Sequence, residues 1–268
     1  MVTVYYRTLG IRFSNLGRYE EALEATQEAV DIYQPLSASY PDTFLSDLAR
    51  SLNNLGVRFS DLDRDEKALE VTQEAVDIYR PLSTSYPEVF IPSLARSLNN
   101  LANKLSNLDC DEKALGIAQE AVDKYRVLVA SYPDIFLSEL AMSLLNLGTI
   151  FNDLSQHEDA FIVTGEALDL YQSLVESCPD VILPDLARGL NNLGDTLSAL
   201  GRCEDALKAY NEATPIIRPL SQKYPQIFDE CLYRNLFGKT QVLQALGREK
   251  EFSSEEMAEF NMLASRFS

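Results

Sequence analysis

The sequence has 268 residues, of which 46 % are apolar and 24 % are charged, and its formal net charge is −18. A chain of this length and apolar content can bury a sizeable core. The excess of acidic residues argues against binding to nucleic acid or to an anionic membrane surface, because both need clustered lysine and arginine.

The cysteines and the apolar segments indicate a cytoplasmic protein. The four cysteines are Cys110, Cys178, Cys203 and Cys231, and none of them forms a C-x-x-C pair. Their spacing does not resemble a disulfide framework, so we expect reduced thiols. We find no continuous apolar run of the ~18 residues that a transmembrane helix needs. The N-terminal residues also lack the apolar core of a signal peptide.

Residues of the same type return every 46 positions along the chain, and this register never slips. The clearest series are Leu48, Leu94, Leu140, Leu186 and Leu232; Ala22, Ala68, Ala114, Ala160 and Ala206; and Pro41, Pro87, Pro133, Pro179 and Pro225. Such repetition predicts about six copies of one structural unit rather than independent domains. We place the copies at about 1–40, 41–86, 87–132, 133–178, 179–224 and 225–268 of a single domain, 1–268.

Each copy reads as two amphipathic helices joined by a polar turn. In the copy 41–86, apolar residues at 48, 52, 55, 59 and 62 follow a spacing of four and three, which places them on one helical stripe. Residues 61–65 form the polar turn, and a second stripe runs from Ala68 to Tyr79. One hairpin cannot bury its apolar face alone, but stacked hairpins share a continuous core. The sequence therefore predicts an all-α solenoid of antiparallel hairpins.

Prolines give less certain boundaries. Pro35, Pro81 and Pro219 fall late in the second helix of their copies, where Val127 and Ser173 stand in others. We therefore expect the helix to continue through this position. Pro92 and Pro184 favour a start of the first helix near those residues, while segments such as 41–45 are open to either the helix or the connection.

The two ends of the chain differ. The first copy begins inside its first helix, near Leu9 and Gly10, with no capping segment, so the chain is either a fragment of a longer protein or an array without an N-terminal cap. At the other end, Ser253 and Glu256 form a predicted capping box before a final amphipathic helix. This helix is expected to close the array.

These residues resemble the tetratricopeptide repeat (TPR). Leu55-Gly56 followed by Phe59, then Ala68 and Ala75, match its pattern of apolar and small residues. The period exceeds the usual ~34 residues, and the longer unit with "LNNL" is similar to the kinesin light chain type. The resemblance implies a right-handed α-solenoid whose first helices line a concave groove.

By this resemblance, residues between the leucines of the first helices line a peptide-binding groove. They are Arg50, Asn53, Asn54, Arg96, Asn99, Asn100, Asn103, Met142, Leu145, Asn146, Arg188, Asn191, Asn192 and Arg234. An asparagine amide donates and accepts hydrogen bonds, so a row of amides can pair with any extended peptide backbone. The arginines would favour acidic ligand groups, and Met142 with Leu145 would form an apolar pocket.

Each of these assignments has a structural alternative. The asparagines can instead bridge neighbouring helices, the arginines can pair with acids of the protein, and Met142 with Leu145 can be ordinary variation in one copy. The single histidine, His157, lies in a polar turn and is expected to be a solvated surface residue.

The predicted function is non-catalytic binding of a protein or peptide ligand that is extended and partly acidic. No metal-ligand cluster or phosphate-binding loop is present in the sequence, so we expect no cofactor and no enzyme activity. The alternative is a structural spacer, or a module that self-associates through the solenoid ends, fused to further domains in a larger sensor protein.

Overall fold

The computed structural model describes Phe13 and residues 17–267. The expected first helix of the first copy, with Leu9 and Gly10, lies outside the described residues. The chain forms two compact units, residues 1–133 and 134–268, and each is described by itself. The prediction of a single domain over 1–268 stays a prediction.

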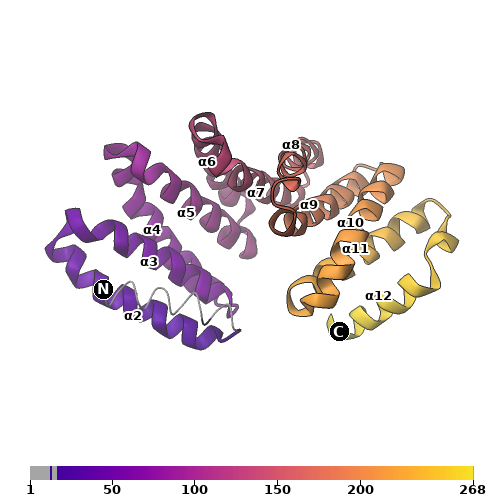
Figure 1. The fold of residues 1–268 in the computed structure, drawn as a ribbon, viewed down its shortest axis with the longest axis horizontal. Helices are drawn as coiled ribbons and strands as arrows, with labels where there is room; N and C mark the ends of the chain where they lie inside the picture. The colour runs from indigo at the N-terminus through magenta and orange to yellow at the C-terminus, as the bar shows by residue number, and fades with distance from the viewer. Residues whose placement is uncertain (1–12, 14–16, 268) are drawn as a thin grey trace. The chain divides into compact units, whose positions relative to one another are not determined.

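The first unit is a row of helices in which each helix packs against the next one in the chain (Figure 1). Its helices are α2 (Tyr19–Ser39), α3 (Pro41–Ser60), α4 (Asp65–Ser85), α5 (Pro87–Asn107) and α6 (Asp111–Ser131). Here α3 and α5 are the first helices of their copies, and α2, α4 and α6 are second helices.

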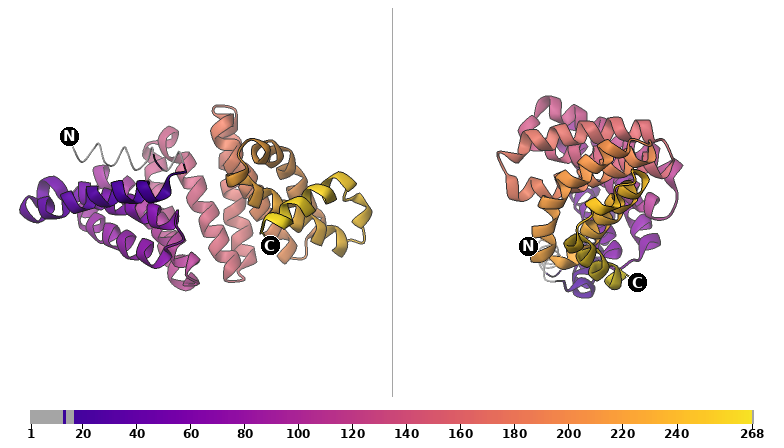
Figure 2. Two further views of the ribbon diagram at one scale, coloured as in Figure 1. Left: turned by 90° about the horizontal axis from the view of Figure 1, so that it is seen from below. Right: turned by 90° about the vertical axis from the view of Figure 1, so that its right-hand side faces the viewer.

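The second unit repeats this arrangement. Its helices are α7 (Pro133–Asp153), α8 (His157–Val175), α9 (Pro179–Ala199), α10 (Cys203–Lys223), α11 (Pro225–Ala245), the short 3-10 helix η1 (Glu249–Glu251) and α12 (Ser254–Phe267). Helices α8 to α11 pack in chain order, and α12 packs against α11 (Figure 2). The predicted all-α, solenoid-type fold of helical hairpins is confirmed for the part of the chain that the structure describes.

Each first helix that the structure describes begins at the proline of the 46-residue series, which settles the boundary that the sequence left open. Pro41 and Pro87 occupy the first turns of α3 and α5, where a missing N–H removes no helical hydrogen bond. Tyr40 and Tyr86 stand just before them with φ of −138° and −136° and ψ of 68° and 70°, outside the helical region that proline disfavours for its predecessor. The expected starts near Pro92 and Pro184 are wrong, because both prolines lie inside helices, α5 and α9.

The second helices continue through their late prolines, as predicted. Helix α2 passes through Pro35 and α4 through Pro81, and α10 contains both Pro215 and Pro219. The C-caps Tyr40 and Tyr86 still donate backbone N–H bonds of 2.8 Å to Leu36 and Leu82. A single residue therefore separates α2 from α3, and another separates α4 from α5.

The hairpin turns share one left-handed residue at a constant place in the repeat. Asp63, Asp109 and Ser155 have φ of 53°, 54° and 58°, and Gly17, Gly201 and Gly247 have φ of 70°, 72° and 65°. Left-handed backbone ends a helix sharply and turns the chain back. The constant position of this turn keeps the two helices of every hairpin in the same register.

The core is formed by the predicted leucine and alanine series, and glycines allow close helix contacts. Ala22, Ala68, Ala114, Ala160 and Ala206 are fully buried. A Cβ at Gly56 would collide with the Thr72 hydroxyl, and one at Gly194 would lie 2.6 Å from the Tyr210 ring. The second helices therefore approach the first helices too closely for any side chain at these glycines.

Helix α7 is unusually apolar. By length and composition alone it is able to cross a membrane, with a mean hydropathy of 1.3 over an 18-residue window, and half of that window is buried in the protein. The helix contains Glu139 and Asn146, so it is not a continuous apolar run. Burial of Leu140, Leu144 and Ile150 accounts for the apolar composition of this helix.

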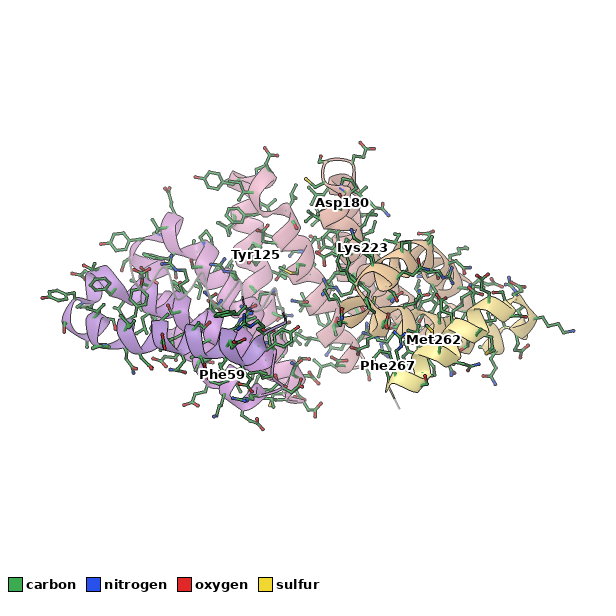
Figure 3. The ribbon with its side chains drawn as sticks, turned by 60° about the horizontal axis from the view of Figure 1, so that its bottom comes forward. Phe59, Tyr125, Asp180, Lys223, Met262 and Phe267 are labelled. Carbon is green, nitrogen blue, oxygen red and sulfur yellow. The ribbon has the colours of Figure 1, made fainter. Side chains whose placement is uncertain are left out.

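Helix α12 closes the second unit and is held by ion pairs. The predicted capping box is present: the Ser253 N–H donates to Glu256 Oε2 at 3.0 Å, and the Glu256 N–H donates to Ser253 Oγ at 3.1 Å. Lys239 of α11 lies 2.8 Å from Glu256. Leu263 is fully buried, whereas Met262 and Phe267 on the same helix are exposed (Figure 3).

Candidate peptide-binding surface

The two asparagines of each "LNNL" segment have different environments. The first ones, Asn53, Asn99 and Asn191, are only 6 %, 4 % and 3 % exposed. The second ones, Asn54, Asn100 and Asn192, are half-buried. Adjacent residues on a helix point about 100° apart, so only one of each pair can face the neighbouring helices.

The buried asparagines join neighbouring hairpins. Asn100 Nδ2 donates to Asn53 Oδ1 at 3.2 Å, which joins α5 to α3. Asn191 Nδ2 donates to the Cys231 carbonyl at 3.0 Å and its Oδ1 accepts from Asn235 at 2.7 Å, which joins α9 to α11. These bonds satisfy amides that would be costly to bury alone. The helix-bridging alternative therefore describes the first asparagine of the pair.

The half-buried asparagines keep hydrogen-bonding capacity. Asn54 has no hydrogen-bond partner among the described residues, and Asn100 uses one donor on Asn53. Asn192 donates to Thr149 Oγ1 at 3.2 Å and leaves its carbonyl oxygen available. Asn103 and Asn146 are also half-buried, on α5 and α7. The set that can meet a ligand is thus smaller than the sequence predicted.

Three of the four arginines already have acidic partners. Arg50 pairs with Asp47 and Arg188 with Asp185, each three residues earlier on the same helix. Arg234 of α11 lies 2.9 Å from Asp195 of α9. Arg96 is exposed and has no ion-pair partner among the described residues. The positive charge available to an acidic ligand is therefore concentrated at Arg96.

The predicted apolar pocket of the fourth copy is not formed. Leu145 is 4 % exposed, and its Cδ atoms would lie within 3.2–3.4 Å of a Cβ at Gly189, so it packs against α9 as a core residue. Met142 is exposed on the same helix. Leucine at this register position fills the space between helices instead of facing outward.

A polar pocket of about 210 Å³ occupies the first-helix side of the second unit. It brings together two predicted residues, Asn192 and Arg234, with Thr149 and Asp195. The Tyr210 hydroxyl donates to Asp195 Oδ1 at 2.6 Å. Burial, followed by the charge of Asp195, raises the pKa of Tyr210 far above its ordinary value, so this hydroxyl remains a donor.

The sequence analysis missed the role of His157 in this pocket. The side chain is half-buried rather than fully solvated, and its Nδ1 lies 3.1 Å from Asn152 Oδ1. Asn152 also donates to Thr196 Oγ1 of α9 at 2.7 Å. The signal available in the sequence was the asparagine five residues before the histidine, across the hairpin turn.

Family comparisons agree with the repeat pattern. Models of the tetratricopeptide repeat match residues 2–34, 48–80 and 187–216, and a model of anaphase-promoting complex subunit 5 matches residues 83–174. A search of curated proteins gives no match. Three segments of the chain thus match the tetratricopeptide repeat, and the fold is similar to that of kinesin light chain-like repeats.

Solved structures share this fold at low sequence identity. BtubC (BKLC) from P. vanneervenii has a TM-score of 0.69 and 18 % identity, over 93 % of this chain and 92 % of that one. TPR-like repeats of a Podosopora anserina protein described as a kinesin light chain have a TM-score of 0.61 and 16 % identity, over 81 % of this chain and 95 % of that one. A Rap protein in complex with competence and sporulation factor has a TM-score of 0.63 and 14 % identity, over 98 % of this chain and 76 % of that one.

Proposed function

We propose that this protein binds an extended peptide or partner segment on the exposed side of its first helices. Asn54 carries the proposal. Its amide has no hydrogen-bond partner among the described residues, on a surface where Asn53 and Asn100 bond to one another. Asn100 and Asn192 each donate one bond to a neighbouring first helix, to Asn53 and Thr149, so helix bridging uses only part of their hydrogen-bonding capacity. A peptide backbone offers donors and acceptors to the amide of Asn54 and to the remaining groups of the other two.

The ligand is proposed to be partly acidic in the first unit. Arg96 lies one turn before Asn100 and has no ion-pair partner within the part of the chain that the structure describes, and a guanidinium binds carboxylates through two parallel hydrogen bonds. In the second unit, Asp195 and Arg234 neutralise one another, so the pocket there suits an uncharged polar group. We also propose that the role is non-catalytic and cytoplasmic, without nucleic acid or membrane partners. TPR folds are generally interaction scaffolds, and a Rap protein of the same fold was solved in complex with a factor.

The first test is affinity capture from the cytosol of the source organism, read by quantitative mass spectrometry. We compare wild type with the triple variant Asn54→Ala, Asn100→Ala, Asn192→Ala. The control is the triple variant Gln119→Ala, Asn211→Ala, Gln222→Ala, which removes three exposed amides from second helices. We expect some partners to be retained by the control but captured about tenfold less, or still less, by the asparagine variant. A tenfold loss of affinity corresponds to ~1.4 kcal/mol of binding free energy.

The acidic character of the ligand is tested separately with any partner so identified. Arg96→Glu should weaken binding by about tenfold, since it replaces an attractive pair by a repulsive one. Melting curves first establish that each variant is folded. Equal capture by all variants would assign the asparagines to helix bridging alone and favour the structural-module alternative.

A further inference from the structure

A second groove lies in the first unit, between the second helices α4 and α6. Its volume is about 710 Å³, and its floor includes Leu69 of α4, Leu105 at the end of α5, and Gly116 and Ile117 of α6. Its rim carries Glu66, Glu70 and Glu112, with Lys113 beside them. None of these residues belongs to the first-helix surface proposed above.

In three other copies, an arginine from the hairpin turn covers the corresponding space, whereas Gln156 stands at this position in the copy that follows the groove. Arg64 reaches back to Glu20 of α2 at 2.8 Å, and Arg248 reaches Glu204 of α10 at 2.8 Å. The guanidinium of Arg202 lies over the Phe161 ring of α8, 4.8 Å from its centroid. These arginines share one register position, so the array has a repeated way to cover a second helix.

At the groove this arginine is missing. The residue 46 positions after Arg64 is Cys110, whose side chain is too short to reach across to α4. As a consequence, Leu69 of α4 is more exposed than its equivalents in two other copies. Leu23 and Leu207 occupy the same register position as Leu69 and are 8 % and 6 % exposed, whereas Leu69 is only half-buried.

Gly116 widens the groove at the same place. Its register equivalents are Glu24, Glu70, Ile162 and Lys208, so the glycine is particular to this copy. No atom lies within 4 Å of where its Cβ would stand, so packing does not require a glycine. A glycine within a helix costs about 1 kcal/mol relative to alanine. It does, however, open the helix backbone to the close approach of another chain.

The charge of the rim indicates the chemistry of the ligand. Glu66, Glu70 and Glu112 have no ion-pair partner among the described residues, whereas Glu20 and Glu204 are paired with arginine. The groove thus combines a half-buried leucine and isoleucine with carboxylates that have no ion-pair partner among the described residues. A ligand with an apolar stripe flanked by arginine or lysine complements both features.

We propose that this groove binds a basic, amphipathic segment of a partner protein. The segment places apolar side chains on Leu69 and Ile117, and its arginine or lysine pairs with the carboxylate of Glu66 in place of the missing turn arginine. The backbone of the segment passes over Gly116. This site is independent of the asparagine surface and is of opposite charge preference.

The test selects ligands from a library of random 16-residue peptides displayed on phage. Wild type is the target, and the variant Cys110→Arg, which restores the turn arginine of the other copies, is used for counter-selection. Enriched peptides are synthesised with a fluorophore, and their affinities are measured by fluorescence anisotropy. We expect enriched peptides to carry an apolar stripe with flanking arginine or lysine, and Cys110→Arg to lower their affinity by about tenfold or more.

Matched variants separate closure of the groove from a general effect of charge. Asn211→Arg adds the same charge on an exposed part of α10 and should leave affinity within about twofold of wild type. Gly116→Lys fills the groove with the residue found at 208 and should weaken binding like Cys110→Arg. The triple asparagine variant should bind normally, which distinguishes this site from the first-helix surface. Circular dichroism and melting curves confirm that each variant folds.

Three results would overturn the proposal. The first is an absence of enriched peptides, or enrichment of acidic ones. The second is equal affinity for wild type, Cys110→Arg and Gly116→Lys. The third is a wild-type dimer in sedimentation that Cys110→Arg dissociates, which would assign the groove to a second copy of this chain.

Discussion

Two helix-interior glycines of the first unit, Gly56 and Gly116, have opposite surroundings. A Cβ at Gly56 would collide with the Thr72 hydroxyl and lie 3.2 Å from the Ala68 carbonyl, whereas one at Gly116 would touch nothing. Thr72 is β-branched and fully buried, so it cannot rotate away. The same substitution should therefore have opposite effects at the two positions.

We expect Gly56→Ala to lower the free energy of unfolding by about 1–3 kcal/mol through overpacking. Gly116→Ala should raise it by about 0.5–1 kcal/mol, because alanine has the higher helix propensity. Chemical denaturation monitored by circular dichroism measures both, and each variant is the other's control. A stable Gly56→Ala protein would show that α3 and α4 pack less closely than described.

Single residues were predictable where the repeat or a local motif fixes them. The small residue at Gly56 and the capping box of Ser253 follow from patterns within a few residues. The sequence did not separate Asn53 from Asn54, because both lie at the edge of the apolar stripe and only the neighbouring hairpin decides which one is buried. His157 was misjudged for a different reason, because its partner Asn152 lies on the other helix of the same hairpin, and the contact across the turn was overlooked.

At the scale of elements, the attachment of α12 depends on ion pairs with little solvent exposure. The Lys239 and Glu256 side chains are 11 % and 14 % exposed, and Arg218 of α10 lies 2.9 Å from Glu259. Burial alone would raise the pKa of Glu256, but hydrogen bonds from Lys239 and Ser253 together lower it below its ordinary 4.5. Glu256 therefore stabilises α12 only while it is ionised.

This lowered pKa predicts a pH-dependent contribution to stability. Because the folded pKa lies below 4.5, the contribution is complete above that pH and is lost as pH falls through the folded pKa. Glu256→Gln should cost about 2 kcal/mol at pH 7, the range for hydrogen bonds to charged groups. The cost should disappear below the folded pKa of Glu256. Denaturation at a series of pH values measures it.

The neighbouring Glu255→Gln is the control for this pH series. Glu255 is exposed in the first turn of α12 and has no ion pair among the described residues. Its substitution should change stability by less than about 0.5 kcal/mol at every pH. A cost of Glu256→Gln that is independent of pH would show that the pair with Lys239 contributes nothing.

Element types were predicted more reliably than element ends. Apolar spacing identified both helices of each copy, and the late prolines were correctly placed inside the second helices. The starts near Pro92 and Pro184 were wrong because proline is tolerated anywhere in the first turns, and Pro87 and Pro179 precede them in the same helices. The Pro41 series held the information, because it recurs in five of the six copies whereas Pro92 has an equivalent only at Pro184.

At the scale of the whole molecule, acidic residues exceed basic residues by 41 to 23, which gives the net charge of −18. Like charges on one chain destabilise the compact state, and salt screens them. Raising NaCl from about 20 to about 200 mM should therefore stabilise the protein by about 1 kcal/mol, or ~2–4 °C in melting temperature for a chain of this size.

A charge-reduced variant tests the cause of this salt response. Glu24→Gln, Glu28→Gln and Glu74→Gln remove three exposed carboxylates and change the net charge from −18 to −15 (−18 + 3). The variant should gain less stability from salt than wild type does. A melting temperature that falls with salt would mean that cross-helix ion pairs, such as Arg80 with Glu120 at 2.7 Å, outweigh the general repulsion.

The repeat class was predictable from sequence, whereas the division into two compact units was not. The 46-residue register continues unchanged through Pro133, where the first unit ends. A repeat pattern reports what each hairpin needs in order to pack on its neighbours, and it does not report how strongly any one interface holds. The groove between α4 and α6 was likewise missed, because it results from two missing groups: the turn arginine that Cys110 replaces and a side chain at Gly116.

The one-residue joints at Tyr40 and Tyr86 restrict how this chain can change length. An extra residue in a helix beside such a joint would turn the next hairpin by about 100° and remove its leucines from the core. A longer flexible connection could compensate for that rotation, but a single connecting residue cannot. Insertions and deletions of a few residues are therefore excluded near the joints, and the array can grow or shrink only by whole hairpins, as duplicated or lost segments of the gene.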